Sequence, residues 1–354
     1  MLPSGKVELL TNCDYVAERQ VVSRISGERY DVSERCRIVD ARYLAPDIPS
    51  RTPPPFEVAA GARVVPVNDL AGLTEPPSQY VVVGSGKTAT DACIELLAQG
   101  VDPDAICWVR PRDPWMLNRA VVQPDPVVFL GMVADTMRAA AAATSLDDVF
   151  LGLERAGIML RIDQSVTPTM TKTPTLATWE LERLRTIEHV IRLGHLRQVE
   201  TGCLTLDGGS VSVGKDTLVV HCAAPGLKYP PLVPIWGESA ITLQTIRTGF
   251  PCFGAALAGY VEATRDDDAE KNRLCPPTPF ADTPAEWAGM NVQGARSAAA
   301  FGSEPDIKAW ANQVALNPAR IQPEHPGSVA LDDVLERLQA DLGPGLTRLT
   351  ELST

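Results

Sequence analysis

The residues whose spacing best fits a known chemistry are the glycines of segment 79–91, Gln-Tyr-Val-Val-Val-Gly-Ser-Gly-Lys-Thr-Ala-Thr-Asp. An apolar stretch runs without a break into Gly84 and Gly86, and a helix-forming stretch follows at once. A glycine pair between a strand and a helix is the context in which a Gly-x-Gly-x-x-Gly/Ala string binds a dinucleotide pyrophosphate. The segment therefore predicts a nucleotide-binding turn.

Each residue of the turn has an expected role. Gly84 allows a tight turn, Gly86 lets a pyrophosphate approach the backbone, and Ala89 lets the helix pack closely on the strand. The helix N-terminus holds the phosphates, and Lys87 adds positive charge there. Asp91, in the first turns of the helix, suits the helix dipole equally well. The candidate cofactor-binding residues of this turn are Gly84, Ser85, Gly86, Lys87, Thr88 and Ala89.

Two alternative interpretations of the turn stay open. Gly-Ser-Gly-Lys-Thr resembles the end of a phosphate loop that binds nucleoside triphosphates, but that motif needs a glycine where Val81 stands. The second alternative is an ordinary strand–helix turn whose glycines serve packing alone.

Two arginines downstream bear on the choice of dinucleotide. Segment 106–109, Ile-Cys-Trp-Val, predicts a second strand that ends in Arg110 and Arg112. An acid at this strand end favours NAD, whereas arginines favour the 2′-phosphate of NADP. Solvated arginines after an edge strand are the alternative, and Asp113 is placed to reach a ribose hydroxyl. The sequence favours NADP, with Arg119 expected on the nicotinamide side.

Composition limits the classes of protein and of partner. The chain has 354 residues, is 45% hydrophobic, and carries a net charge of −12. It is long enough for a large core and two domains. Its acidity argues against nucleic acid or an anionic membrane as the main partner. No apolar run is long enough to span a bilayer, and residues 1–6 lack a signal-peptide core, so a cytoplasmic location is expected.

The cysteines and histidines argue against metal and dithiol chemistry. The 8 cysteines are scattered and form no Cys-x-x-Cys pair, as expected of reduced thiols in a cytosol. The 4 histidines, at positions 189, 195, 221 and 325, are too dispersed for a metal cluster. No metal site is expected, and no serine–histidine–acid order identifies catalytic residues. His221, at the end of an apolar strand, is more typical of a buried structural histidine than of an acid or base.

The remaining segments give an order of expected elements. Residues 6–44 predict a β-meander, with strands at 6–10, 20–25 and 28–32. Largely helical segments are expected at about 127–157, 178–193 and 253–263, and a buried strand at 216–224. Beyond residue 331 we expect one amphipathic helix that ends near Gly343 and Pro344.

This layout resembles the two-dinucleotide-binding flavoproteins, particularly the flavin-containing monooxygenase-like and pyridine nucleotide-disulfide oxidoreductase-like families. In those proteins an NADP domain is inserted into an FAD domain, and an apolar strand ending near Ala-Thr-Gly marks each crossing. The first crossing is similar to residues 38–42, Ile-Val-Asp-Ala-Arg, with Pro46 and Pro49 downstream. The second is similar to residues 218–224, Leu-Val-Val-His-Cys-Ala-Ala, and residues 84–91 are similar to the NADP turn.

The chain departs from that family at its start. Those proteins begin with a βαβ unit whose Gly-x-Gly-x-x-Gly binds the FAD pyrophosphate, whereas this sequence begins in the expected meander and has no second such string. A truncated sequence, a separate chain that supplies the missing half, and a loss of flavin binding all stay open. A sheet without its first strand and helix would expose an edge, which predicts a second chain or an oligomer as partner.

The resemblance implies an α/β fold, with a Rossmann-like NAD(P)-binding domain inserted into a partial FAD-binding-like ββα domain. The partial domain is expected at 1–55 and 216–330, and the NADP-binding domain at 56–215. A helical insertion at about 127–193 and a C-terminal helical tail at 331–354 complete the expected organisation.

The implied activity is that of an NADPH-dependent, FAD-linked oxidoreductase of the monooxygenase-like kind, in a complete or split copy. NADPH would deliver hydride to a flavin, and the reduced flavin would pass electrons to oxygen or another acceptor, with a small-molecule substrate. The disulfide-reductase branch is disfavoured because paired cysteines are absent. A non-catalytic NADP-binding module is the main alternative, and a phosphate-loop nucleotidase is the second.

Overall fold

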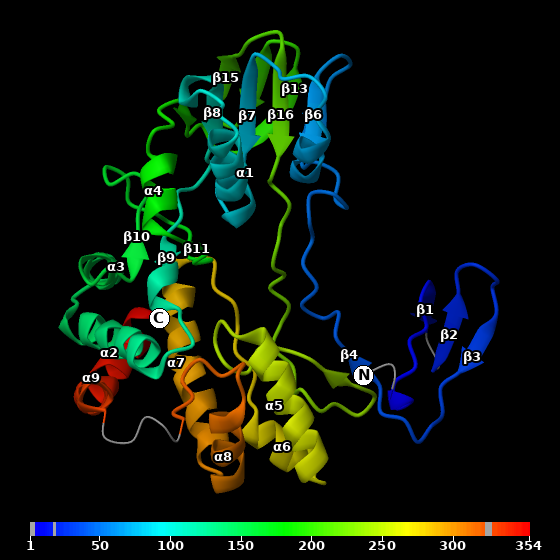
Figure 1. Cartoon of the computed structure of the whole chain (residues 1–354), viewed down its shortest axis with the longest axis vertical. Coiled ribbons are helices and arrows are strands. Elements are labelled where there is room, and N and C mark those ends of the chain that lie inside the picture. Colours follow the sequence, from blue (N-terminus) through cyan, green and yellow to red (C-terminus); the bar gives the residue numbers. More distant parts are fainter. Residues whose placement is uncertain (1–3, 17–18, 323–327) are drawn as a thin grey trace.

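A parallel sheet forms the upper part of the molecule in the computed structural model, which describes residues 4–16, 19–322 and 328–354 (Figure 1). Within these residues its strand order is β12-β8-β7-β16-β6, and every neighbouring pair is parallel. The strands are β6 (Arg63–Pro66), β7 (Gln79–Val83), β8 (Ile106–Val109), β12 (Val190–Ile191) and β16 (Thr217–His221). This arrangement confirms an α/β fold with a Rossmann-like parallel sheet.

Both faces of this sheet are buried, which explains why its strands are continuous apolar runs. Along β7, Tyr80 and Val82 belong to the core beneath helix α1 (Lys87–Ala98), while Val81 and Val83 belong to the core on the opposite face. A second sheet, of order β15-β14-β13-β5, contributes to that opposite core. Its strands are β5 (Glu57–Val58), β13 (Leu196–Glu200), β14 (Cys203–Leu206) and β15 (Gly209–Ser212).

The segment expected to be a helix at 178–193 is shorter than its pattern predicts. Helix α4 covers Thr178–Leu184 only, and the chain then forms β12 at the sheet edge. Backbone hydrogen bonds from Trp108 N to His189 O (2.8 Å) and from Arg110 N to Ile191 O (2.9 Å) hold β12 there. The prediction was wrong beyond residue 184 because pairing with β8 outweighs the amphipathic pattern.

Helices dominate the lower left part of Figure 1. One core of aromatic and aliphatic side chains holds α2, α3, α7 and α9 together, and within it Phe150 contacts both Trp115 and Trp287. The helices are α2 (Pro126–Ala142), α3 (Leu146–Arg155), α7 (Pro284–Gly302) and α9 (Val329–Leu352). Short strands lie beside them: β9 (Met116–Asn118), β10 (Met159–Leu160) and β11 (Thr175–Leu176). The insertion expected to be helical at 127–193 thus contains β10, β11 and β12 as well as helices.

The C-terminal helix continues beyond its expected end. α9 passes through Pro344 and ends at Leu352, where the sequence predicted an end near Gly343. A Cβ at Gly345 would lie 2.6 Å from the carbonyl oxygen of Met137, so α9 packs backbone to backbone on α2 at this point. This close packing offsets the cost of an internal proline. The expected tail is therefore part of the helical layer.

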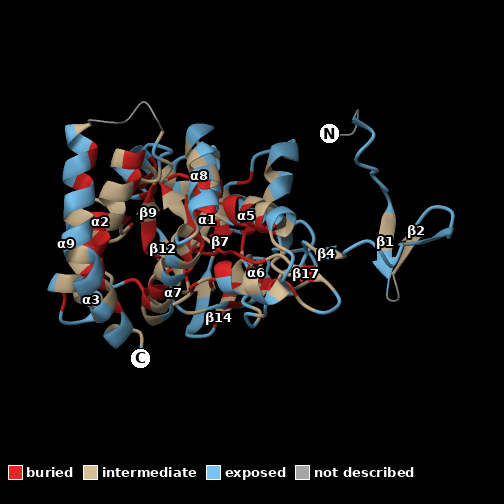
Figure 2. Ribbon diagram, turned by 90° about the horizontal axis from the view of Figure 1, so that it is seen from below, coloured by how far each residue is buried: buried red, intermediate tan, exposed pale blue. Residues whose placement is uncertain are grey.

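An antiparallel meander lies apart from the main body, at the right of Figure 2, and is largely exposed. It consists of β1 (Cys13–Val16), β2 (Gln20–Ser23) and β3 (Arg29–Asp31), in the order β1-β2-β3. The expected meander is confirmed for its later strands. Residues 6–10, expected to be a strand, form none.

Two chain segments connect the upper sheet to the lower part. Strand β4 (Val39–Asp40) pairs in parallel with β17 (Ile241–Thr242), so the chain leaves and returns at neighbouring points. Asp47 and Gly226 exchange backbone hydrogen bonds of 3.0 and 3.2 Å between the two segments. Since β16 pairs with β7 and β6, the sheet extends one strand past the boundary expected at 215.

Helices α5 (Pro251–Thr264), α6 (Asp268–Leu274) and α8 (Pro305–Gln313) follow, and α5 confirms the helix expected at 253–263.

No helix within the described residues is both long and apolar enough to cross a membrane.

Candidate functional site

The turn after β7 lies at the point where the strand order of the sheet reverses. From β7, the chain adds β8 and β12 on one side and then returns to place β16 on the other. Ligands of open parallel sheets bind at this topological switch point, outside the carboxyl ends of the strands. The structure therefore places the predicted glycine turn where such a sheet binds a nucleotide.

The backbone of Gly84 needs glycine for two reasons. Its φ of +132° is a conformation that side chains rarely adopt, and a Cβ would lie 3.1 Å from the carbonyl oxygen of Cys222. The indole N–H of Trp108 donates a 2.7 Å hydrogen bond to the Gly84 carbonyl oxygen. These contacts place the turn between the ends of β8 and β16.

The turn and the start of α1 present unused hydrogen-bond donors. No described residue accepts a hydrogen bond from the backbone N–H groups of Ser85, Gly86, Lys87 or Thr88, and α1 has no side-chain cap. The Ser85 hydroxyl is buried and also has no partner in the described structure. A Cβ at Gly86 would meet no atom within 4 Å, so the space above it is open. This combination suits an anionic ligand. Ala89 is fully buried and brings α1 close to β7.

A buried carboxylate gathers two cations beside this turn. Glu180 of α4 lies 3.0 Å from a guanidinium nitrogen of Arg119 and 3.7 Å from Nζ of Lys87. It also accepts a 2.6 Å hydrogen bond from the backbone N–H of Ala177. Lys87 additionally pairs with Asp91 at 2.5 Å. Sequence reasoning named Lys87 and Arg119 separately and missed Glu180, because the helical pattern of α4 gives no sign of its inward carboxylate.

Arg110 is buried at the carboxyl end of β8, with 2% of its surface exposed. Its guanidinium lies 4.7 Å from the centre of the Trp108 ring and 3.3 Å from Asp113, and burial lowers its pKa. Asp113 also pairs with Arg192 at 2.8 Å, and Arg192 reaches Asp163 at 2.8 Å. Asp113 is therefore engaged by two arginines.

A cavity of about 480 Å³ lies beside this cluster, along the edge strand β12. Three arginines line it (Arg110, Arg185 and Arg192), together with the carboxylates of Asp163 and Glu188 and apolar side chains that include Leu184 and Val190. The Nε and Nη1 atoms of Arg110 are buried without hydrogen-bond partners in the described part of the chain. Arg192 had no signal in the sequence that set it apart from other arginines.

Arg112 is held by other parts of the protein. Its guanidinium lies 2.6 Å from the Asp282 carboxylate and donates a 2.7 Å hydrogen bond to the carbonyl oxygen of Thr169. These contacts tie the loop after β8 to the segment that precedes α7. The structure thus brings together the turn, Lys87 and Arg119, and it places Arg112 in a separate ion pair.

The phosphate-loop alternative does not fit the geometry of the turn. Only the residues Gly84, Ser85 and Gly86 connect β7 to α1, which is too short to wrap around a phosphate group in the way of that motif. Lys87, which would have to reach the β-phosphate, pairs with two carboxylates instead.

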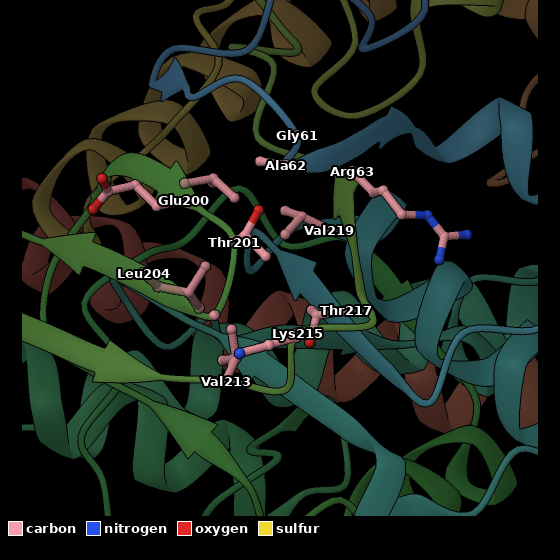
Figure 3. Close-up of a pocket in the computed structure, with 12 residues that line it drawn as sticks. Gly61, Ala62, Arg63, Glu200, Thr201, Leu204, Val213, Lys215, Thr217 and Val219 are labelled. Atoms are coloured by element: carbon pink, nitrogen blue, oxygen red, sulfur yellow. The ribbon is translucent and has the colours of Figure 1, made fainter.

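A second depression lies at the opposite end of the sheet (Figure 3). Gly61 and Arg63 at the start of β6, and Thr217 at the start of β16, line it. Its volume of about 10 Å³ is roughly that of one water molecule. Its size and its place at the amino ends of the strands both argue against a nucleotide site.

His221, the last residue of β16, is buried beside the edge of the Phe56 ring. Its Nδ1 accepts a 3.3 Å hydrogen bond from the backbone N–H of Ala223, and burial lowers its pKa.

No group of three or more potential ligands is placed to hold a metal ion in the part of the chain that the structure describes. His325 lies outside that part.

Comparison with known proteins gives relatives but no activity. No family model matches the chain. Uncharacterized proteins of Mycobacterium tuberculosis and Mycobacterium bovis are 38% identical over 320 residues, which is 90% of this chain and 59% of each relative. The chain thus spans about three-fifths of the length of these curated relatives. The crystal structure of L-lysine 6-monooxygenase from Pseudomonas syringae aligns over 64% of this chain and 54% of that one, with 16% identity. Its TM-score of 0.27 does not establish a shared fold.

Proposed function

We propose that this protein binds NADP(H) at the turn between β7 and α1 and serves as the nucleotide-binding part of an FAD-linked oxidoreductase. The observation that carries the proposal is the set of unpartnered donors at the switch point. The backbone N–H groups of residues 85–88 and the buried hydroxyl of Ser85 have no acceptor among the described residues, and a Cβ at Gly86 would meet no atom within 4 Å. A pyrophosphate supplies the acceptors that these groups lack.

The residues around the turn have different roles in binding the nucleotide. The amides and Ser85 hold the pyrophosphate, while Lys87 and Arg119 add positive charge that Glu180 keeps beside the turn. When bound, NADPH supplies a hydride. The chain's own contribution is to hold and orient the nucleotide across the carboxyl ends of β7 and β16.

The preference for NADP over NAD is assigned to the cavity beside β12. Arg110 and Arg192 line this cavity on the side of the sheet where the adenosine half of a dinucleotide lies. Arg192 takes the place that sequence reasoning gave to Arg112, because the guanidinium of Arg112 is already held by Asp282. A 2′-phosphate in the cavity would compete with Asp113 and Asp163 for Arg192.

The flavin half of the proposal depends on a partner or on further sequence. The chain has no second Gly-x-Gly-x-x-Gly, and so it offers no pyrophosphate turn of this kind for FAD. The parallel pairing of β4 with β17 beneath the inserted sheet favours the flavoprotein layout. The alternative is an NADP-binding module without turnover, which would bind NADPH and never oxidise it.

Titration calorimetry with NADPH, NADH and ATP tests the binding proposal. We expect wild type to prefer NADPH, and Gly86→Val to weaken NADPH binding by about tenfold or more, because its side chain fills open space over the turn. Gly259→Val is the matched control, since that glycine of α5 also has open space and lies outside the turn. Unchanged NADPH affinity in Gly86→Val would refute the site.

A second measurement distinguishes an active oxidoreductase from a binding module without turnover. NADPH absorbance is followed after FAD and oxygen are added to the purified protein. Consumption of NADPH that requires FAD and disappears in Gly86→Val supports the oxidoreductase. Tight NADPH binding without consumption, even with excess FAD, favours the module.

A further inference from the structure

An arginine far from the nucleotide turn is surrounded by aromatic rings. Arg247 lies in the loop between β17 and α5, and its guanidinium carbon is 5.4 Å from the centre of the Phe129 ring. The corresponding distances are 5.8 Å to Phe253 and 6.0 Å to Phe250. Phe129 comes from α2, whereas Phe250 and Phe253 come from the start of α5. Two helices far apart in sequence thus enclose one cation.

This cation has no anionic partner in the described structure. Arg247 forms no hydrogen bond or ion pair with any described side chain, although burial lowers its pKa to about 10. Lys271 offers a contrast, because that buried cation pairs with Glu262 at 2.7 Å and with Asp268 at 3.1 Å. The exposure of Arg247 is intermediate, and its guanidinium nitrogens keep some contact with solvent. A partly buried charge is costly unless it is paired, and ring faces offset only part of that cost.

Hydrogen bonds and close packing anchor the loop that carries Arg247. The Thr245 carbonyl oxygen accepts hydrogen bonds from the backbone N–H and the hydroxyl of Thr278, at 2.6 and 3.1 Å. Thr248 packs so tightly on α7 that a Cβ at Gly294 would lie 1.9 Å from its Oγ1. The Arg247 carbonyl oxygen also accepts a 3.0 Å hydrogen bond from Phe250 N. A backbone anchored on both sides of an unpaired cation is the arrangement expected of a preorganised binding residue.

We propose that Arg247 anchors a second binding site, for a small organic molecule that carries an oxyanion, either a carboxylate or a phosphate. The oxyanion would accept hydrogen bonds from the guanidinium N–H groups, for which the described residues provide no acceptor, as a charge-assisted pair. The apolar part of the ligand would contact the rings of Phe129 and Phe250, which already contact each other at 5.4 Å. This site goes beyond the proposed function, because none of its residues belongs to the nucleotide turn.

Benzoate and inorganic phosphate are the probes for this site, with neutral benzamide as the control ligand. Titration calorimetry on the full chain would measure their affinity in wild type, Arg247→Met, Arg247→Lys and Arg273→Met. Arg273 is an exposed arginine of α6 and serves as the matched control. Phenylglyoxal labelling of Arg247, read by peptide mass, would show protection by the bound anion.

The proposal predicts a specific combination of results. Arg247→Met should bind both anions about tenfold or more weakly, Arg247→Lys should lie between it and wild type, and benzamide should not bind. Without ligand, Arg247→Met should melt at the same temperature as wild type or higher, because it removes an unpaired, partly buried charge. NADPH affinity should not change in Arg247→Met, which separates this site from the nucleotide turn.

Two outcomes would overturn the proposal. In the first, benzoate and phosphate fail to bind wild type, or bind Arg247→Met equally well. In the second, Arg247→Met melts several degrees lower and neither anion protects Arg247 from phenylglyoxal, which would make the arginine a packing element between α2 and α5. Binding of benzoate tighter than phosphate would identify a carboxylate ligand, and the reverse order a phosphate ester.

Discussion

The indole N–H of Trp108 donates a 2.7 Å hydrogen bond to the carbonyl oxygen of Gly84, and Trp108 is fully buried. Because a trans peptide points its carbonyl and its N–H in opposite directions, this bond also turns the N–H of Ser85 away from the core. A residue of β8 therefore sets the direction of the first free donor of the turn. Trp108 additionally lies beneath the guanidinium of Arg110, so it connects the turn to the cavity.

Trp108→Phe should destabilise the protein and weaken nucleotide binding. It leaves the Gly84 carbonyl oxygen without its partner, which costs about 1 to 3 kcal/mol in the free energy of unfolding. Denaturant unfolding and NADPH titration measure the two effects. Trp179→Phe is the control, because Trp179 is 53% exposed and should change neither quantity. An unchanged unfolding free energy in Trp108→Phe would contradict this role.

Gly84→Ala should lower the free energy of unfolding by about 1 to 3 kcal/mol, because alanine is strained at a φ of +132° and its Cβ meets Cys222. Gly86→Ala should leave stability almost unchanged, since its φ is −84° and the space around it is open. Denaturant unfolding of both variants checks the contrast. Equal losses of stability would mean that the two glycines do not have the separate roles that the geometry indicates.

Ser85→Ala should separate binding from stability. The Ser85 hydroxyl is buried without a partner, so its removal should leave the ligand-free protein as stable as wild type or slightly more stable. NADPH affinity should fall by about threefold to tenfold, as expected for one lost hydrogen bond. Thermal melts with and without NADPH measure both effects, and Ser212→Ala on the exposed strand β15 is the control. A loss of stability without ligand would instead indicate a structural role for the hydroxyl.

Glu180→Gln should weaken the fold and strengthen nucleotide binding. A pyrophosphate bound at the turn would compete with this carboxylate for Lys87 and Arg119. The amide removes that competition, so NADPH affinity should rise by a few-fold, most clearly at low salt. Titrations at two ionic strengths check this result. A fall in NADPH affinity would show that holding the cations in place matters more than competing for them.

His221 should contribute to the pH dependence of stability. Burial holds its pKa in the folded protein below the ordinary value of 6.5, so the unfolded chain takes up a proton first as the pH falls. The contribution of His221 is complete above pH 6.5 and is lost progressively below it. Melting temperatures between neutral and acidic pH should therefore fall more steeply for wild type than for His221→Gln. Parallel curves would show that another group controls this range.

Elements with strong local signals could be predicted from the sequence. The apolar run before Gly84, the glycine pair and the following helix are all determined by neighbouring residues, and all three lie where they were expected. The two errors in helix length arose where distant contacts decide. Val190 and Ile191 complete the edge of the sheet beside β8, and Gly345 lets α9 continue past a proline by packing on α2.

The sequence by itself determined the turn, because strand, glycines and helix are consecutive and their backbone requirements are local. Only the tertiary structure decided what surrounds it. Trp108, Arg119 and Glu180 reach the turn from separate elements, and Arg112 is drawn instead to Asp282, 170 residues away. Ion pairs and hydrogen bonds of this kind depend on which elements the fold brings together, and no local pattern of residues records that choice.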